Sequence, residues 1–531
     1  MGYAHDYAHD IMHRGRIPME PVDFVPDWAD RPRKAKYYPG TELLTLPTAP
    51  TAVPGAAAGP GEGFTLPLLG GMLQDSYGFT GRRLAVQANT DLAALPHYTH
   101  ANWSRGTASG GGLYPVGVYW AAGAGAPVVP GLYHYTPHQH GMRRLLAGDV
   151  TAEVHAALGA GAGVPGGGQY LILGVKYWQN AFKYNSFSFH AVSMDVGALI
   201  QTWRLWAAEQ GLRIAPVMWF DEERLARLIG VAPEDEGFFA VIPLEWAGSS
   251  GAVPAAVPTD GPPGEPPAVG HRDSERSRTV LEFETLRRIH TATLGRAADR
   301  PAPGALAPAA ALPARATGQP PVPLPAPAPA RLGPAAALRA RRSSFGRFEA
   351  GRPVTAAELA ATLADCAATS LGSEAEGPDG PRLTSLYVFV NHVVGVAPGT
   401  YAYDPDDPAG PTLRLLVPGP PGPFLQRNYF LSNYNLEQAA AVLVPTVRTT
   451  AVLDAVGDRG YRLVNGTVGA VAQTFYTTAA ALGLGAGVAL GFDNISHIEQ
   501  LGLTGTDEAP LLIMLLGHER PRPADFRHEI A

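Results

Sequence analysis

Residues 467–484 read TVGAVAQTFYTTAAALGL, and residues 195–212 read DVGALIQTWRLWAAEQGL. Matching positions keep one constant spacing within these stretches and beyond them: Gly197 and Gly469, Phe220–Asp221 and Phe492–Asp493, and Gly230 and Gly502. Farther upstream, GLYHY at 131–135 is similar to GTYAY at 399–403. A spacing held over so long a stretch indicates a duplicated unit. We therefore expect two tandem copies of one domain, not a solenoid array.

The second copy of this stretch lies in a run without any charged residue, from Gly466 to Phe492. Such a run is long enough to resemble a membrane span. The first copy, however, carries Arg204 and Glu209, so its twin is not expected to lie in lipid. A helix that is apolar nearly all round is buried. The run therefore predicts a buried helix followed by a glycine-rich turn, at the seam where the two copies pack.

Composition separates the two copies. Pro, Ala and Gly dominate residues 249–275 and 298–337, as in linkers. Residues 275–295 between them have the apolar spacing of a helix. The predicted organisation is a first domain with an N-terminal extension at 1–248, a linker with one helix at 249–337, and a second domain at 338–531.

Within each half, short strand-like runs alternate with longer helix-like runs. Strands are predicted at 116–121, 169–175, 238–244, 385–391, 440–444 and 510–516. Helices are predicted at 193–210, 222–229, 355–366, 467–482 and 495–501. This pattern favours an α+β fold in which helices pack against a small sheet.

Composition also bounds the function. The chain has 531 residues, which allows about two to four domains, and a net charge of −7. That charge argues against a general nucleic-acid binder. The single cysteine, Cys366, excludes an internal disulfide. The N-terminal sequence MGYAHDYAHDIMHRGR has no apolar core of a signal peptide. We expect a soluble cytoplasmic protein without a nucleic-acid or membrane partner.

Five short motifs follow one another along the chain: DWADRPRKAKYYPG (27–40), TASGGGLYP (107–115), FKYNSFSF (182–189), RRSSFGRF (341–348) and GLGAGVALGF (483–492). Together they resemble the flavin-dependent nitroreductase superfamily, and within it the streptolysin-type azoline dehydrogenases of peptide natural-product biosynthesis. Three motifs depart from the family pattern. Thr107-Ala108 replaces the usual Pro, Phe345 replaces a basic residue, and the later arginines of the third motif are absent.

In that superfamily, two copies of the fold form a homodimer and each FMN lies between subunits. The resemblance thus implies two fused nitroreductase-like domains that form a pseudo-dimer within one chain. The two copies are unequally equipped. Only the second has the Arg-Arg-Ser opening, and it has Gly491 where the first has Trp219. Only the first has TASGGGLYP. The resemblance therefore implies one FMN per chain.

The resemblance also assigns residues to the FMN. Arg341, Arg342 and Arg520 would neutralise its phosphate, which guanidinium groups suit, and Ser343 would add a hydroxyl. Gly485, Gly487 and Gly491 would let the flat ring approach the backbone, with Leu490 beside it and the Gly491 N–H facing flavin N5. From the other copy, Ser109, Gly110 and Gly111 would line the flavin, with Ser109 donating toward the ring or ribityl chain.

Lys183 and Tyr184 resemble the catalytic pair of the azoline dehydrogenases. Oxidation of an azoline to an azole removes a proton from one carbon and a hydride from its neighbour. FMN would take the hydride, and Lys183 or Tyr184 would take the proton. The sequence does not decide between the two, and a surface position at the end of a strand is the structural alternative.

Other motifs rank lower. HYTH (97–100) and HQH (138–140) have no supporting Cys or carboxylate, so no metal site is expected. GLGAG follows a helix, which is the wrong context for a dinucleotide fingerprint. Arg31, Arg33, Lys34 and Lys36 form a basic run that is either a solvated face, which we favour, or a docking surface for an acidic leader peptide or partner.

The sequence thus favours an FMN-dependent azoline dehydrogenase of a ribosomal, thiopeptide-like peptide pathway. Its partners would be a modified precursor peptide and cyclodehydratase enzymes. Two alternatives stay open: an NAD(P)H-dependent nitro or quinone reductase of the same fold, and a non-catalytic scaffold that binds a peptide or partner enzymes.

Overall fold

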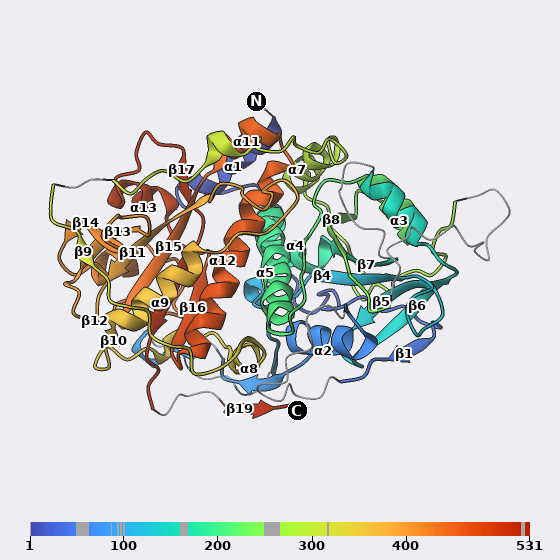
Figure 1. The fold of residues 1–531 in the computed structure, drawn as a ribbon, viewed down its shortest axis with the longest axis horizontal. Helices are drawn as coiled ribbons and strands as arrows, with labels where there is room; N and C mark the ends of the chain where they lie inside the picture. The colour runs from blue at the N-terminus through green and yellow to red at the C-terminus, as the bar shows by residue number, and fades with distance from the viewer. Residues whose placement is uncertain are drawn as a thin grey trace.

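A computed structural model of the chain describes residues 2–530 except 49–62, 87, 93–94, 96–97, 99–100, 160–167, 249–265, 316–317 and 522–525. Two sheets lie at opposite sides of the molecule, and two long helices lie between them at its centre (Figure 1). The sheets come from different halves of the chain, as the duplication predicts.

The first sheet has six strands in the order β1-β6-β5-β4-β7-β8, and all its neighbours are antiparallel. Its strands are β1 (Leu43–Thr45), β4 (Val116–Ala122), β5 (Gly131–Thr136), β6 (Gly141–Ala147), β7 (Gln169–Lys176) and β8 (Glu236–Pro243). Strands β4, β7 and β8 are buried along nearly their whole length. Long apolar runs occur here because helices cover the sheet.

The second sheet repeats this order with its own strands. Its path is β16-β18-β15-β11-β13-β14-β9, with β17 paired to β15. The strands are β9 (Val322–Pro323), β11 (Thr384–Val390), β13 (Gly399–Asp404), β14 (Thr412–Pro418), β15 (Ala441–Arg448), β16 (Gly485–Ala489), β17 (Glu508–Pro510) and β18 (Ile513–Gly517). The order β6-β5-β4-β7-β8 in the first copy equals β14-β13-β11-β15-β18 in the second, so the duplication is confirmed in the topology.

The helices also follow the duplication, with α5 and α6 of the first copy matching α12 and α13 of the second. The helices are α1 (Tyr3–His13), α2 (Leu66–Ser76), α3 (Thr151–Leu158), α4 (Trp178–Tyr184), α5 (Ser188–Glu209), α6 (Glu222–Ile229), α7 (Glu284–Leu294), α8 (Pro334–Ala340), α9 (Ala356–Ala367), α10 (Gly422–Arg427), α11 (Thr449–Val456), α12 (Gly460–Ala481) and α13 (Asn494–Gln500).

The central seam is formed by α5 against α12 (Figure 1). Glycines let the two backbones touch. A Cβ added to Gly197 would lie 1.9 Å from the Gly466 carbonyl oxygen, and one added to Gly469 would lie 2.1 Å from the Met194 carbonyl oxygen. No side chain fits at such distances, which explains why both copies have Gly at this position. The predicted packing of the charge-free helix at the seam is confirmed.

The matching Phe-Asp and Gly positions are helix caps. Asp221 accepts a hydrogen bond from the Arg224 N–H at 2.9 Å at the start of α6. Asp493 accepts from the Ile495 N–H at 3.1 Å at the start of α13. A carboxylate at this position satisfies N–H groups that have no partner inside the helix. Gly230 follows α6 with φ 72°, a left-handed conformation that Gly adopts without strain.

Both ends of the described chain cross to the other copy. Strand β19 (Phe526–Glu529) pairs with β2 (Gly81–Leu84), which also pairs with β3 (Asn102–Ser104). Helix α1 packs on α11 and α13 of the second copy. Each half therefore completes the other, and one hydrophobic core runs through both.

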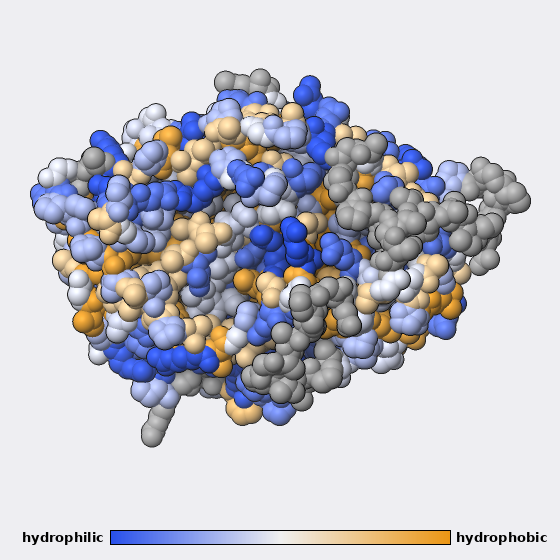
Figure 2. All heavy atoms as spheres, viewed as in Figure 1, coloured by the Kyte–Doolittle hydropathy of each residue, from blue (hydrophilic) through white to orange (hydrophobic). Residues whose placement is uncertain are grey.

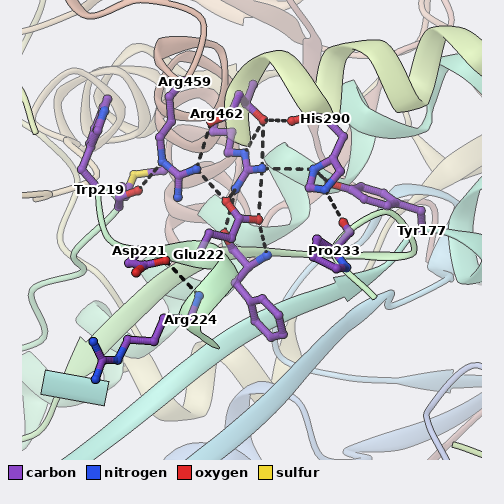
Figure 3. Close-up of polar contacts among 12 residues, drawn as sticks. Tyr177, Trp219, Asp221, Glu222, Arg224, Pro233, His290, Arg459 and Arg462 are labelled. Atoms are coloured by element: carbon purple, nitrogen blue, oxygen red, sulfur yellow. Dashed lines mark hydrogen bonds and ion pairs between the residues drawn. The ribbon is translucent and has the colours of Figure 1, made fainter. Parts of the chain in front are cut away.

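A buried ion-pair cluster also joins the halves (Figure 3). Glu222, at the start of α6, accepts hydrogen bonds from Arg459 at 2.7 Å and Arg462 at 3.0 Å. All three side chains are at most 2% exposed. Arg462 also lies 3.3 Å from His290 on the linker helix α7. The cluster thus ties the first copy, the second copy and the linker together.

Most predicted elements occur within a few residues of their expected positions, but three expectations are wrong. Residues 485–489, expected in a glycine-rich turn, form strand β16, because they pair along β18. The expected linker helix at 275–295 is shorter, from Glu284 to Leu294. The linker at 298–337 contributes β9 to the second sheet.

The molecular surface has no continuous apolar band on the face shown in Figure 2, where hydrophilic and hydrophobic residues are interspersed. Among the described residues, no helix combines the length and the apolar character that crossing a bilayer requires. The charge-free run is accounted for by burial, since α12 lies almost wholly inside the protein.

Candidate functional site

The small-residue segment of the first copy lies against the second copy. The Ala108 N–H donates to Gln473 Oε1 of α12 at 2.9 Å, and Gln473 Nε2 donates to the Gly106 carbonyl at 3.2 Å. Arg341 Nε donates to the same carbonyl at 2.8 Å. The RRSSFGRF motif therefore contacts Arg105 and Gly106, the two residues directly before TASGGGLYP.

Lys183 and Tyr184 converge on this segment from the end of α4. A Cβ on Gly111 would lie 2.3 Å from the Tyr184 hydroxyl and 2.7 Å from Lys183 Nζ. Gly111 also has φ 62°, so both the space and the backbone require glycine. Lys183 Nζ lies 4.7 Å from the centre of the Tyr184 ring. The pair is thus placed at the segment that the resemblance assigns to the flavin, not at the end of a strand.

A third polar side chain at this segment was missed by the sequence. Asp195 on α5 accepts hydrogen bonds from the Ser109 hydroxyl at 2.6 Å and from the Gly110 N–H at 2.8 Å. Burial raises the pKa of Asp195 to about 7. The signal in the sequence was a carboxylate in the apolar stretch of α5 that precedes Arg204. Since the Ser109 hydroxyl gives its hydrogen to Asp195, Ser109 serves here to fix the segment.

Lys34 approaches the same segment from the N-terminal region. Lys34 Nζ donates to the Gly112 carbonyl at 3.1 Å. Of the basic run, Arg31, Arg33 and Lys34 are exposed, as the favoured interpretation requires. For Lys36 that interpretation is wrong, because its ammonium is buried and forms an ion pair with Glu236.

The turn after β16 differs from the matching turn of the first copy in the hydrogen bonding of one backbone N–H group. In the described part of the chain, the Gly491 N–H has no hydrogen-bond acceptor. At the matching position of the first copy, the Trp219 N–H donates to Glu374 Oε1 at 2.7 Å, and Trp219 is 1% exposed. The Arg300 guanidinium donates a hydrogen bond to the Trp219 carbonyl at 2.9 Å. Protein side chains therefore surround Trp219, at the position that matches Gly491.

Arg14, from the turn that ends α1, joins the turn after β16 to the Lys183–Tyr184 side. Its guanidinium donates to the Leu490 carbonyl and, at 2.8 Å, to Asn494 Oδ1. The same guanidinium lies 4.8 Å from the centre of the Phe187 ring, which in turn lies 6.2 Å from that of Tyr184. Burial lowers the pKa of Arg14 to about 10, so it stays cationic at neutral pH.

The predicted phosphate-binding residues gather, each with a protein partner. Arg341 donates to the carbonyls of Arg105 and Gly106. Arg342 forms an ion pair with Glu519. The Ser343 hydroxyl is 2.8 Å from that of Tyr476.

Arg520 lies at the edge of this group and pairs with Asp91 of the first copy. Arg347, which sequence reasoning did not single out, lies 3.8 Å from Glu519. Arg342 and Arg347 thus share the Glu519 carboxylate, and Arg520 follows Glu519 directly in the chain. A phosphate would compete with Glu519 for Arg342.

Two glycines assigned to the flavin ring have another role here. A Cβ on Gly487 would lie 2.5 Å from the Tyr434 ring, against which Phe345 stacks at 5.1 Å. A Cβ on Gly485 would lie 2.7 Å from Glu519 Cγ. Protein side chains thus occupy the space over both glycines, in contrast to the expectation.

The histidine motifs do not form a metal site among the described residues, where no group of three metal-ligating side chains occurs. His140 Nδ1 lies 3.0 Å from the Tyr135 hydroxyl, and the His138 ring packs at 5.0 Å on Phe79. His97 and His100 lie outside the described residues.

Comparisons with known proteins relate the chain to nitroreductases. Residues 394–518 match the Nitroreductase family. A protein of Methanocaldococcus jannaschii named as a nitroreductase is 34% identical over 142 residues, or 25% of this chain. The chain spans 64% of the length of that curated relative. The crystal structure of a protein named as a nitroreductase from Anabaena variabilis has a TM-score of 0.72 and 22% identity, and it covers 98% of this chain and 100% of its own.

The chain has a nitroreductase-like fold, present twice. The family match is confined to the second copy, and the full-length likeness extends the fold to the whole chain. A chain of the E. coli microcin synthetase McbBCD complex, solved with truncated pro-MccB17 bound, is also similar over 34% of this chain and 70% of its own, with a TM-score of 0.28 and 18% identity.

Proposed function

We propose that the protein is an FMN-dependent dehydrogenase that oxidises azoline rings of a modified precursor peptide to azoles. The observation that carries this proposal is the convergence of Lys183 and Tyr184 on Gly111. An amine and a phenol side by side offer a proton acceptor and a cation that stabilises the acceptor's anion. An NAD(P)H-dependent nitroreductase needs no such base, because its substrate loses no carbon-bound proton.

The residues of the second copy fit an FMN at the junction with the first. The Gly491 N–H lacks an acceptor among the described residues, although its twin in the first copy has one. A donor so placed suits a polar ring atom. The guanidinium groups near Ser343 suit a phosphate monoester. When bound, FMN would supply the hydride acceptor, which no side chain of this chain can replace.

The chain's own residues would then divide the remaining tasks. Lys183 or Tyr184 takes the proton from the azoline ring carbon as the hydride leaves the neighbouring carbon, so the ring loses two electrons and two hydrogens. Asp195 holds Ser109 and Gly110, and with them the backbone against which the pair lies. Molecular oxygen is the proposed terminal oxidant.

The filled pocket of the first copy supports one FMN per chain. Glu374 accepts the N–H groups of both Met218 and Trp219, at 2.9 and 2.7 Å. The backbone donors that a second ring would need are therefore taken. Cyclodehydratases that form azolines, and a cytoplasmic location beside them, belong to the same proposal.

The test is flavin stoichiometry followed by a mass assay. Purified chain is expected to carry about one FMN and to lower the mass of a cyclodehydrated peptide by about 2 Da per ring without NAD(P)H. Lys183→Ala and Tyr184→Phe should keep the flavin and lose the mass change. Tyr37→Phe, an exposed tyrosine elsewhere in the first copy, is the matched control. Flavin bleaching by NADPH with turnover of a quinone and unchanged peptide would refute the proposal, as would a chain that takes up no FMN.

A further inference from the structure

A cavity of about 330 Å³ lies beside α4, outside the candidate site. Its inner wall is apolar and buried: Trp178, Phe283 and Leu286 are each at most 9% exposed. Val280 and Leu281 stand at its edge, 52% and 44% exposed. A cavity of this size and lining is typical of a site for a small molecule or a single side chain.

The mouth of the cavity is negatively charged. Four carboxylates line it, from Glu234, Asp235, Glu275 and Glu282, together with two cations, Lys176 and Arg287. Both cations are already neutralised. Lys176 bonds Glu275 at 2.6 Å, and Arg287 bonds Glu282 at 2.8 Å.

The two remaining carboxylates, Glu234 and Asp235, are exposed and form no salt bridge among the described residues. Burial raises the pKa of Asp235 and its acidic neighbours raise it further, although Lys176 acts in the opposite direction. A cation at the mouth would relieve this like-charge repulsion. The adjacent His290 does not supply one, because burial lowers its pKa to about 4 and so keeps it neutral at neutral pH.

We infer that this cavity binds an amphipathic cation, with an apolar body against Trp178 and Leu286 and an ammonium or guanidinium group at Glu234 and Asp235. In a peptide, two sources have this chemistry: a free N-terminus on an apolar residue, and an apolar residue next to Lys or Arg. The charge complementarity excludes a ligand that carries a carboxylate beside its apolar body.

The cavity and the candidate site share helix α4. Ala181 lines the cavity, and the helix ends at Lys183 and Tyr184. Because residues two apart point to opposite sides of a helix, a peptide anchored here would pass around α4 to reach the Lys183–Tyr184 end. That link to catalysis rests on the proposed function, whereas binding in the cavity does not.

The experiment is calorimetric titration of the full chain, without substrate, by small probes of one shape and different charge. Phenylalaninamide carries the ammonium, N-acetylphenylalaninamide is neutral and N-acetylphenylalanine is an anion. We expect phenylalaninamide to bind at least about tenfold more tightly than either acetylated probe. N-acetyl-leucyl-lysinamide tests a side-chain cation, and the tighter of the two cations identifies the source.

The double variant Glu234→Gln/Asp235→Asn should lower the affinity for phenylalaninamide to that of the neutral probe, a loss of about tenfold. Leu281→Ala, at the exposed edge, should weaken all probes alike. Glu284→Gln is the matched control, since Glu284 is an exposed carboxylate nearby that does not line the cavity. The inference is overturned by no detectable binding of either cation, by equal or tighter binding of an acetylated phenylalanine probe, or by a double variant that binds as the wild type does. None of these outcomes depends on flavin or azoline chemistry, so the proposed function would stand or fall separately.

Discussion

Replacing Glu222 by Gln should destabilise the whole protein, because this carboxylate bonds two buried arginines of the other copy. Arg459 and Arg462 donate to it at 2.7 and 3.0 Å, and the Phe238 N–H donates at 2.7 Å (Figure 3). A carboxamide keeps the shape but not the charge. Two guanidinium groups would then be buried without a counter-ion, which is costly in a medium of low polarity.

The magnitude follows from the carboxyl group itself. Although burial alone would raise it, Arg462 and Arg459 hold the pKa of Glu222 at about 2, against an ordinary 4.5. At about 1.4 kcal/mol for each tenfold change, that difference corresponds to about 3 kcal/mol of folding free energy. The contribution is complete above pH 4.5 and is lost as the pH falls toward 2, because the unfolded state then binds the proton first.

The assay is urea denaturation of wild type, Glu222→Gln and Glu223→Gln, whose exposed carboxylate on the same helix is the matched control. The free energy of unfolding of Glu222→Gln should be about 3 kcal/mol lower than that of wild type at pH 5.5, and this gap should shrink by about 1 kcal/mol at pH 3.5. A gap below 1 kcal/mol at pH 5.5, or one that widens in acid, would refute the reasoning.

Three further changes test the seam and the site. Gly491→Trp, which installs the residue of the closed twin turn, should abolish retention of FMN, measured by flavin absorbance after gel filtration, while the helix content stays unchanged. Gly197→Ala should cost about 2–3 kcal/mol in denaturation because its methyl would meet a backbone oxygen at 1.9 Å, whereas Gly125→Ala, with nothing within 4 Å, should cost far less. For Asp195→Asn, the free energy of unfolding relative to wild type should rise by about 3 kcal/mol between pH 5 and pH 8. Burial raises the carboxyl pKa to about 7, so ionising the wild-type carboxyl opposes folding. A difference that does not change with pH would count against this.

The duplicated architecture could be predicted from the sequence because each repeated residue has a local physical task. Asp221 and Asp493 cap helices, and Gly197 and Gly469 permit backbone contact at the seam. Each of these roles depends only on the helix that carries the residue or on the matching helix of the other copy. The residues are therefore kept at the same spacing in both copies, and this spacing can be seen in a single sequence.

The partners of the site residues could not be predicted, because they come from distant segments that fold against them. Nothing local links Glu519 to Arg342, or Glu374 to the Trp219 turn. The role of Asp195 could not be predicted for the same reason, because it depends on the Gly110 N–H that the carboxylate binds. The resemblance of GLGAGVALGF to a glycine-rich turn predicts a turn at 485–489, whereas pairing with β18 makes these residues a strand.

Fusion of the two copies changes what each one has to preserve. In a homodimer a single sequence must build both pockets, so a residue that closes one closes the other. Here Trp219 and Glu374 close one pocket while Gly491 keeps its N–H without an acceptor among the described residues, because the two turns belong to different parts of the chain. The joined halves also cannot separate on dilution, since α5 and α12 share one polypeptide. The closed turn can therefore serve as packing for the seam, and under the proposed function TASGGGLYP and the Lys183–Tyr184 pair are needed on only one side.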